Sequence, residues 1–376
     1  MRAVRYVFHP TPCLGQAFST CNWPGNGEYP GQVVVQGRNP FLICIFFPRA
    51  NHQSVRGITR RAFVRSSFAA GLSVPFLRPS VWAAAEPAPH PLSLDVPITD
   101  AHVHFWDPAR LDYRWLRNSP IGGAKLPADY WKAATGFRVE KLVFVQAECR
   151  RDQSRSEAAW VEKLAQDEPR IAAMVAFAPM DDEKALALAL EGFSHRPRVK
   201  GIRHLIQSEP DVEFCLRPQF VAGVKRLANS NLVFEVGARD EQLPAVAKLV
   251  ERCPDVSFVL NHLGNPRIRE GAFTPWDQNV RRLAALPNIG CKVSGAATKA
   301  DWKTWKPEQL KPYIDHVLKA FGFDRVMFGS DWPVCTLACS FRRWLEVLDE
   351  ITSGCTRGER ARLFSGNARK VYRIGA

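Results

Sequence analysis

Eight short apolar runs alternate with stretches of helical spacing between residues 98 and 333, and this alternation constrains the fold more than any other feature. The runs span residues 98–106, 141–149, 171–180, 199–206, 232–238, 256–264, 289–295 and 325–333. Near-continuous apolar strands separated by helices indicate βαβ units and a parallel sheet. Eight such strands in roughly 280 residues match the size of a closed barrel. The sequence therefore predicts a single-domain (β/α)8, TIM-like barrel.

A doubly wound open sheet is the alternative α/β architecture. Sheets of that kind commonly carry a glycine-rich, phosphate-binding turn directly after a strand. None of the eight runs is followed by such a turn. The barrel is therefore the favoured interpretation.

Polar side chains cluster at the carboxyl ends of the predicted strands. They are His102, His104, Gln146, Glu148, Arg203, His204, Glu235, His262, Lys292 and Asp331. In a (β/α)8 barrel these ends surround the active site. His102 and His104 stand two apart, so they share one face of their strand, about 7 Å from each other. Two imidazoles at that spacing suit a metal ion or a carbonyl oxygen.

The first 85 residues have the composition of a leader. Arg60 and Arg61, a short apolar stretch and small residues ending at Ala85 resemble a twin-arginine export signal over residues 55–85. The apolar stretch is too short and too broken by proline to insert stably in a membrane. These features predict engagement with the export machinery, a periplasmic or secreted location, and a mature barrel over residues 86–376.

Residues 1–54 precede this signal and show no regular period. Met174 is the next methionine after Met1, so a shorter form would need another start codon, such as one at Val55. Residues 1–54 are therefore interpreted as an over-extended gene start, with a disordered extension as the alternative.

The net charge of +14 lies disproportionately in the leader, where residues 1–85 hold nine arginines and one acidic residue, Glu28. The remaining chain has no basic cluster with interleaved aromatic residues, which argues against nucleic-acid binding. The seven cysteines after the leader are scattered, as small core residues are. Trp276, Trp302, Trp305 and Trp332 are interpreted as packing or mouth-lining aromatics.

Five motifs in this order, "DAHVHFWDP", "GIRH", "LNHLGNP", "CKVSG" and "MFGSDWP", resemble the amidohydrolase superfamily. The resemblance is closest to its branch of sugar-acid lactonases and pyrone dicarboxylate lactonase, and it covers residues 98 to about 373. It implies a barrel that hydrolyses a small ester, lactone, C–N or C–C bond with water. The resemblance also implies two possibilities for a cofactor. Related branches bind one divalent metal, with zinc as the first candidate, whereas several lactonases of this branch work without one.

The resemblance assigns roles to individual residues. Asp331 matches the aspartate that takes a proton from water, and His102, His104 and His262 match histidines that hold a metal or polarise a carbonyl. His204 matches a further catalytic histidine, and Arg203 beside it would meet the substrate. Because adjacent strand residues face opposite ways, one of these two is structural, and His204 is preferred as the inward group.

Three further residues, Gln146, Lys292 and Trp332, are candidates for binding the substrate. For Lys292 a structural ion pair is an equally good interpretation. The motif departs from its relatives at Asn261, which is expected to point outward beside His262. It also departs at Asn265, where relatives carry lysine, and this puts the family's substrate contacts in doubt.

The sequence thus predicts a hydrolase that opens a small sugar-acid or carboxylated lactone. A metal-dependent decarboxylase or C–N hydrolase on the same barrel is one alternative. An exported, non-catalytic binding protein is another. The sequence specifies neither the substrate nor the oligomeric state.

Overall fold

The computed structural model describes residues 94–375. The predicted leader, residues 1–54 and 55–85, lies outside the described residues, and so do residues 86–93 of the predicted mature chain.

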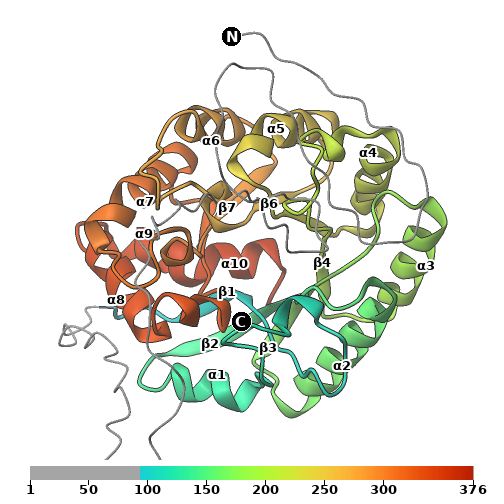
Figure 1. The fold of residues 1–376 in the computed structure, drawn as a ribbon, viewed down its shortest axis with the longest axis horizontal. Coiled ribbons are helices and arrows are strands. Elements are labelled where there is room, and N and C mark those ends of the chain that lie inside the picture. The colour runs from blue at the N-terminus through green and yellow to red at the C-terminus, as the bar shows by residue number, and fades with distance from the viewer. Residues whose placement is uncertain (1–93, 376) are drawn as a thin grey trace, which may run out of the picture. The chain divides into compact units, whose positions relative to one another are not determined.

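Eight parallel strands form one sheet in which each strand pairs with the next along the chain (Figure 1). They are β1 Ile98–Val103, β2 Val139–Val145, β3 Ile171–Ala176, β4 Val199–Arg203, β5 Val233–Val236, β6 Phe258–Leu260, β7 Ile289–Val293 and β8 Val326–Phe328. Each overlaps one of the predicted apolar runs. The (β/α)8 barrel is confirmed.

The barrel closes between β8 and β1 through the residues that follow β8. The amide of Asp331 donates to the carbonyl of His102 (2.9 Å), and the amide of His104 donates to the carbonyl of Trp332 (2.8 Å). The buried Asp100 carboxylate reinforces this seam, because its Oδ1 accepts from the amides of Ser330 (2.8 Å) and His102 (3.2 Å). Four predicted site residues, His102, His104, Asp331 and Trp332, therefore also close the barrel.

Strand alternation divides the buried side chains between two layers. The inner cluster contains Ala101, Val143, Val145, Ala173, Val175, Val233, Val259 and Met327. The alternate residues of the same strands pack outward in the larger cluster that includes the helices. Both faces of each strand are thus covered, which explains why the runs are almost continuously apolar.

Helices surround the sheet (Figure 1). They are α1 Pro127–Ala133, α2 Ser154–Asp167, α3 Glu183–Ser194, α4 Pro218–Lys225, α5 Leu243–Arg252, α6 Trp276–Ala284, α7 Pro307–Phe321, α8 Phe341–Ile351, α9 Arg357–Ala361 and α10 Asn367–Val371. Local signals start several of them. Asp182 caps α3 by accepting from the amide of Ala185, and Ser340 caps α8 by accepting from that of Arg343.

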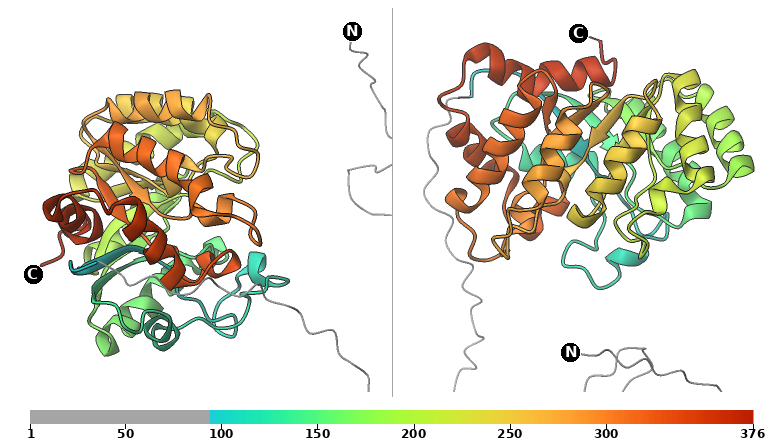
Figure 2. Two further views of the ribbon diagram at one scale, coloured as in Figure 1. Left: turned by 90° about the vertical axis from the view of Figure 1, so that its left-hand side faces the viewer. Right: turned by 90° about the horizontal axis from the view of Figure 1, so that it is seen from above.

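The two ends of the barrel differ. α10 lies across the end where the strands begin, and the loop after β1 projects at the opposite end (Figure 2, right). Tyr372, just after α10, packs into the inner cluster and closes that end. The carboxyl ends of the strands are therefore the ones open to ligands.

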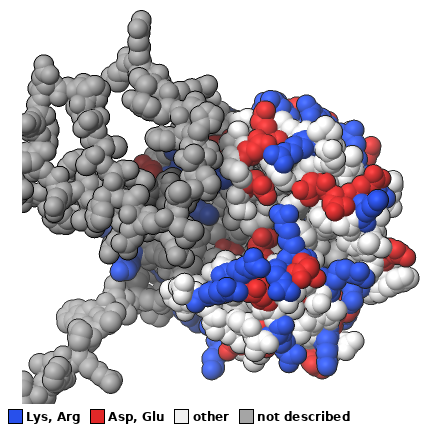
Figure 3. All heavy atoms as spheres, turned by 45° about the vertical axis from the view of Figure 1, so that its right-hand side comes forward, with Lys and Arg blue, Asp and Glu red and all other residues white. Residues whose placement is uncertain are grey.

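Two surface properties bear on partners. No helix among residues 94–375 is long and apolar enough to cross a membrane. On the face of the barrel in Figure 3, basic and acidic side chains are interspersed, unlike the single-sign patch that nucleic acid requires.

Candidate active site

A cavity of about 450 Å³ opens at the carboxyl ends of the strands. It is lined by His104, Arg114, Trp115, Ala147, Glu148, Arg203, Leu205, Gln207, Ser208, His262, Thr298, Lys299, Asp331 and Val334. Four of these, His104, Arg203, His262 and Asp331, are predicted site residues. Its volume lies in the range of small-molecule sites.

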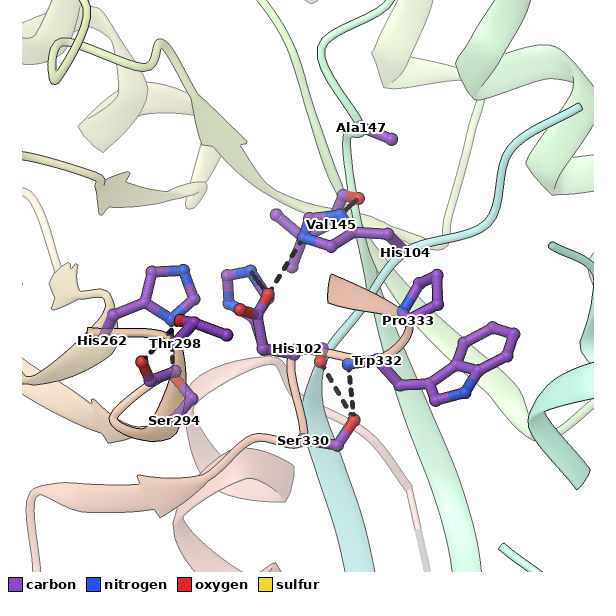
Figure 4. A network of polar contacts seen from close by, with 12 residues as sticks. His102, His104, Val145, Ala147, His262, Ser294, Thr298, Ser330, Trp332 and Pro333 are labelled. Atoms are coloured by element: carbon purple, nitrogen blue, oxygen red, sulfur yellow. Dashed lines mark hydrogen bonds and ion pairs between the residues drawn. The ribbon is translucent and has the colours of Figure 1, made fainter. Parts of the chain in front are cut away.

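His104 and Asp331 line the floor of this cavity, and His102 lies next to His104 (Figure 4). The Asp331 Oδ1 atom lies 3.7 Å from His102 Nε2 and 3.4 Å from His104 Nε2. A β-bulge makes this possible. The register of β1 against β2 shifts between Asp100 and Val103, so Ala101 packs in the inner cluster while Val103 packs outward. This shift of phase lets both histidines approach the cavity.

His262 reaches the same floor by a different route. It follows β6 with φ +53°, in the left-handed region, and its Nδ1 lies 2.9 Å from the hydroxyl of Ser294. Its ring lies against that of His102, with centroids 4.5 Å apart. The ring of His102 thus lies between those of His262 and His104, as Figure 4 shows.

The predicted orientation of Asn261 is wrong. Asn261 follows β6 with extended backbone and shares the phase of Val259, which packs in the inner cluster. Its side chain is fully buried, and neither polar atom has a hydrogen-bond partner among the described residues. Asn261 and His262 both face inward because the left-handed turn at His262 breaks the alternation.

Asp331 also has a left-handed backbone, with φ +58°. The backbone is held in this conformation by the hydrogen bond from the Asp331 amide to the His102 carbonyl and by the β-bridge between Val103 and Trp332. A non-glycine residue in this region is uncommon and clusters at functional sites. The turn aims the carboxylate back into the cavity.

Burial and neighbouring charges tune these groups. Burial lowers the pKa of His102 well below its ordinary value and that of His262 to about 3, so both imidazoles are neutral at pH 7. Burial alone would raise the pKa of Asp331. The facing His262 and His104 and the nearby Lys299 outweigh it, and the net pKa lies below 3.8. Asp331 is therefore an ionised base beside the neutral imidazoles of His102 and His262.

These directions predict a flat pH profile. The basic form of Asp331 is lost only when the pH falls through its lowered pKa, and His262 stays neutral to about pH 3. We therefore expect kcat/KM, corrected for spontaneous hydrolysis, to be constant from about pH 5 to 8 and to fall below about pH 4. An initial-rate profile in constant-ionic-strength buffers measures this. An acid limb near pH 6 that persists after replacement of Asp100, whose pKa burial raises to about 6, by asparagine would contradict the assignment.

The structure places Arg203, not His204, in the cavity, which corrects the predicted orientation of this pair. Arg203 has the inward phase of β4 and donates to the carbonyl of Gln146 (2.6 Å). His204 is buried outside the cavity among Phe177, Phe214 and Phe220. Its Nδ1 accepts from the amide of Met180 (3.1 Å). A ring with these partners does not reach a ligand in the cavity.

The other predicted substrate contacts do not line the cavity. Lys292 is fully buried and pairs with Glu235 at 2.7 Å, as the structural interpretation expected. Trp332 packs against Phe105 and Tyr130, and points away from the imidazoles in Figure 4. The Gln146 side chain is buried and binds its neighbour Glu148.

Several cavity residues were missed by sequence reasoning. Arg114, Trp115 and Lys299 come from the loops after β1 and β7. Their signal is weak, because a charged or aromatic residue in a loop is ordinary. Asp100 was overlooked beside the histidines although it holds both strands of the closing seam.

The residues at the floor fit a divalent cation in number and spacing. One donor atom from each of His102, His104 and Asp331 lies within 4.8 Å of the other two. A metal-bound imidazole usually donates its other N–H to an acceptor. The Nδ1 atom of His104 meets this condition, since it lies 2.7 Å from the carbonyl of Val145.

His102 fits this condition less well. Its Nδ1 lies 3.2 Å from the Lys292 ammonium, which itself donates to Glu235 (2.7 Å). A charged lysine is a donor only, so Nδ1 accepts and the ring proton of neutral His102 resides on Nε2. That proton must leave before Nε2 can bind a cation. Lys292 thus opposes the binding of a metal ion by His102.

Removing this lysine is therefore expected to strengthen metal binding. Lys292→Met should raise the affinity for Zn²⁺ by about 10-fold or more, the scale of partners that orient a ligand. Competition with a chromophoric chelator measures the affinity. Lys299→Met, which removes a cavity charge without touching His102, is the matched control and should change it less. If both substitutions raise the affinity for Zn²⁺ equally, the loss of a positive charge alone accounts for the change.

Known proteins resemble this chain over the described barrel. The family model described as amidohydrolase matches residues 99–374. A Burkholderia multivorans protein named L-fucono-1,5-lactonase is 35% identical over 298 residues, covering 73% of this chain and 95% of that protein. A Scheffersomyces stipitis protein named L-rhamnono-gamma-lactonase is 24% identical over 332 residues, covering 74% of this chain and 98% of that protein. A crystal structure of a Burkholderia multivorans amidohydrolase with bound zinc superposes with a TM-score of 0.69 at 32% identity. It covers 74% of this chain and 100% of its own.

Proposed function

Because the chain belongs to the amidohydrolase family, we propose that it opens the lactone of a sugar acid by attack of water. The chain is a hydrolase, and relatives named as sugar-acid lactonases support this substrate class. The observation that carries the proposal is the Asp331 carboxylate, held beside two imidazoles on the floor of a cavity. The three basic residues of that cavity, Arg114, Arg203 and Lys299, suit a substrate that becomes an anion.

In the proposed reaction Asp331 takes a proton from a water molecule as its oxygen attacks the lactone carbonyl. General base catalysis of this kind contributes about 10²–10⁴-fold. The carbonyl oxygen gains negative charge. In this proposal the Nε2–H of His102 and the ring of His262 stabilise that charge together with the cations of Arg203 and Lys299. The ring C–O bond then breaks, and the proton held by Asp331 passes to the departing alkoxide oxygen, which becomes a hydroxyl group. The new carboxylic acid releases its remaining proton to solvent and leaves as a carboxylate.

A divalent metal is compatible with this proposal. Zinc held by His102, His104 and Asp331 would act as a Lewis acid on the carbonyl or on water. The zinc in the related crystal structure supports such a site. The neutral imidazoles of His102 and His262 and the basic cavity residues offer the same charge stabilisation without a metal. These residues are therefore consistent with a metal-bound enzyme and with a metal-free one.

The test is proton release by the purified chain over a panel of 1,4- and 1,5-lactones of sugar acids, before and after chelation. Bound metal is quantified on the same sample. Turnover that survives chelation with no metal would establish catalysis by Asp331 and the histidines, and turnover lost with a stoichiometric metal would make His102 and His104 ligands. Hydrolysis of no lactone would overturn the proposal, and release of CO₂ from aromatic acids would favour the decarboxylase.

We also propose that the enzyme meets its substrate outside the cytoplasm. The support is the twin-arginine pattern at Arg60 and Arg61 followed by the small residues up to Ala85. N-terminal sequencing of the protein from its native cells tests this. A mature chain beginning after Ala85 is expected, and an uncleaved chain in the cytoplasm would contradict it.

A further inference from the structure

A second cavity adjoins the catalytic one and has no role in the proposed chemistry. It has a volume of about 620 Å³ and is lined by Trp302 and by a rim that includes Arg239, Asp240 and Arg267. We call it the Trp302 groove. It shares Gln207, Ser208, Thr298 and Lys299 with the catalytic cavity. A ligand seated over Asp331 can therefore extend into the groove without leaving the protein surface.

Trp302 is exposed and fixed. Its side chain is 45% exposed, and its indole N–H donates to the carbonyl of Thr298 (3.0 Å). Since that donor is satisfied within the protein, the exposed indole has no polar group left to offer. An indole face that stays in water beside a cavity is free to pack against the apolar face of a ligand.

The loop that carries Trp302 is tied to the catalytic floor. The Thr298 hydroxyl donates to the carbonyl of Gly295 (2.8 Å), and Gly295 packs directly against His262. The amide of Arg269 donates to the carbonyl of Lys299 (2.9 Å), which fixes the loop from the rim. The indole therefore has a defined position relative to the lactone site.

A second exposed tryptophan lies in the catalytic cavity. Trp115 is 42% exposed, and its indole N–H donates to the carbonyl of Ala147 (2.8 Å). Each of the two adjoining cavities thus contains one fixed and partly exposed indole. Sugar rings present C–H faces that pack on such surfaces, while their hydroxyls need hydrogen-bond partners at the edge.

The rim of the Trp302 groove supplies those partners. Arg267 pairs with Asp240 (2.8 Å), and Arg239 pairs with Glu241 (2.7 Å) and donates to the carbonyl of Glu209 (3.1 Å). A carboxylate accepts at two oxygens and a guanidinium donates from five N–H groups, so paired side chains keep capacity for a ligand. Fixed polar groups beside an apolar platform are the composition of a specific small-molecule site.

We propose that the Trp302 groove is a second sugar subsite and that the preferred substrate is a lactone carrying a further sugar ring. The lactone ring would occupy the catalytic cavity, and the attached ring would pack on Trp302 with its hydroxyls toward Asp240 and Arg267. This assignment rests on the proposed lactonase function. It narrows the substrate class to lactones of oligosaccharide-derived sugar acids.

The kinetic test compares glucono-1,5-lactone with cellobiono-1,5-lactone, whose second ring is linked through O4, on the full chain. The wild type should have the lower KM for the two-ring lactone. Trp302→Ala should raise that KM about 10-fold and leave the values for the one-ring lactone unchanged. Trp302→Phe should restore part of the loss. Leu188→Ala, which truncates an exposed apolar residue of α3 away from the groove, should change neither.

Calorimetric titration with cellobionate and gluconate separates this inference from the proposed function, because binding needs no turnover. Tighter binding of cellobionate that is lost in Trp302→Ala supports the subsite even if neither lactone is hydrolysed. The subsite is overturned if the wild type binds both acids alike, or if Trp302→Ala weakens both equally.

Discussion

Asp331→Asn is expected to lower kcat by at least about 100-fold while the barrel remains folded. Asparagine has nearly the shape of aspartate and is among the residues that best tolerate the left-handed backbone found here, φ +58°. The substitution also keeps the hydrogen bond from the amide of residue 331 to the His102 carbonyl, which helps close the barrel. The substitution therefore removes the proton acceptor and little else.

Asp181→Asn is the matched control for this experiment. Asp181 also faces an imidazole, with its Oδ1 3.8 Å from His204 Nδ1, but it lies outside the catalytic cavity. We expect this variant to keep its kcat. Circular dichroism and thermal unfolding of both variants establish that the fold is intact. Near wild-type turnover by Asp331→Asn would remove Asp331 from the role of base.

The architecture was predictable because it depends on properties that each segment carries by itself. A strand covered on both faces is apolar throughout, and the eight runs show this without knowledge of their partners. The polar residues at their ends were equally visible, because a polar side chain after a buried strand needs solvent, a ligand or a buried partner such as the one Lys292 has in Glu235. His104, His262 and Asp331 were found this way, and they do line one cavity.

Side-chain direction was less predictable because it depends on backbone irregularities. The argument from alternation assumes a regular strand, which holds for β4, but it does not say which of two neighbours takes the inner phase. At β6 the assumption fails, since a left-handed turn brings His262 inward after Asn261. At β1 a bulge between Asp100 and Val103 reverses which residues face the inside of the barrel. The bulge in β1 contains no glycine or proline that would have indicated it, whereas the turn after β6 includes Gly264, whose signal does not fix the direction of His262.

The loop residues were unpredictable for a different reason. Lys299 and Trp302 approach the site because the segment after β7 is tied back by Thr298 and by the amide of Arg269. The bond from Arg269 joins distant parts of the chain, and no local pattern specifies it, whereas the bonds of Thr298 lie within the loop itself. Sequence reasoning thus gave the catalytic floor more reliably than the surfaces that would select a substrate.

Gly295→Ala is expected to lower kcat/KM by about 100-fold although residue 295 bears no catalytic group. A Cβ atom at this position would lie 2.7 Å from His262 Nδ1 and 3.0 Å from its Cγ, so the ring has to move. Its present place is defined by the Ser294 hydroxyl on one side and the His102 ring on the other. A displacement of about 1 Å in a catalytic group costs on the order of 100-fold in rate.

The backbone effect of this substitution has to be separated from the contact with His262. Gly295 has φ +64°, where an alanine costs about 1–2 kcal/mol. Gly271→Ala is the matched control, because Gly271 has φ +62° and no atom within 4 Å of an added Cβ. Both variants should lose similar stability in thermal unfolding, but only Gly295→Ala should lose activity. If the two are equally active, the position of His262 does not limit catalysis, and the oxyanion is stabilised by His102 and the cavity cations alone.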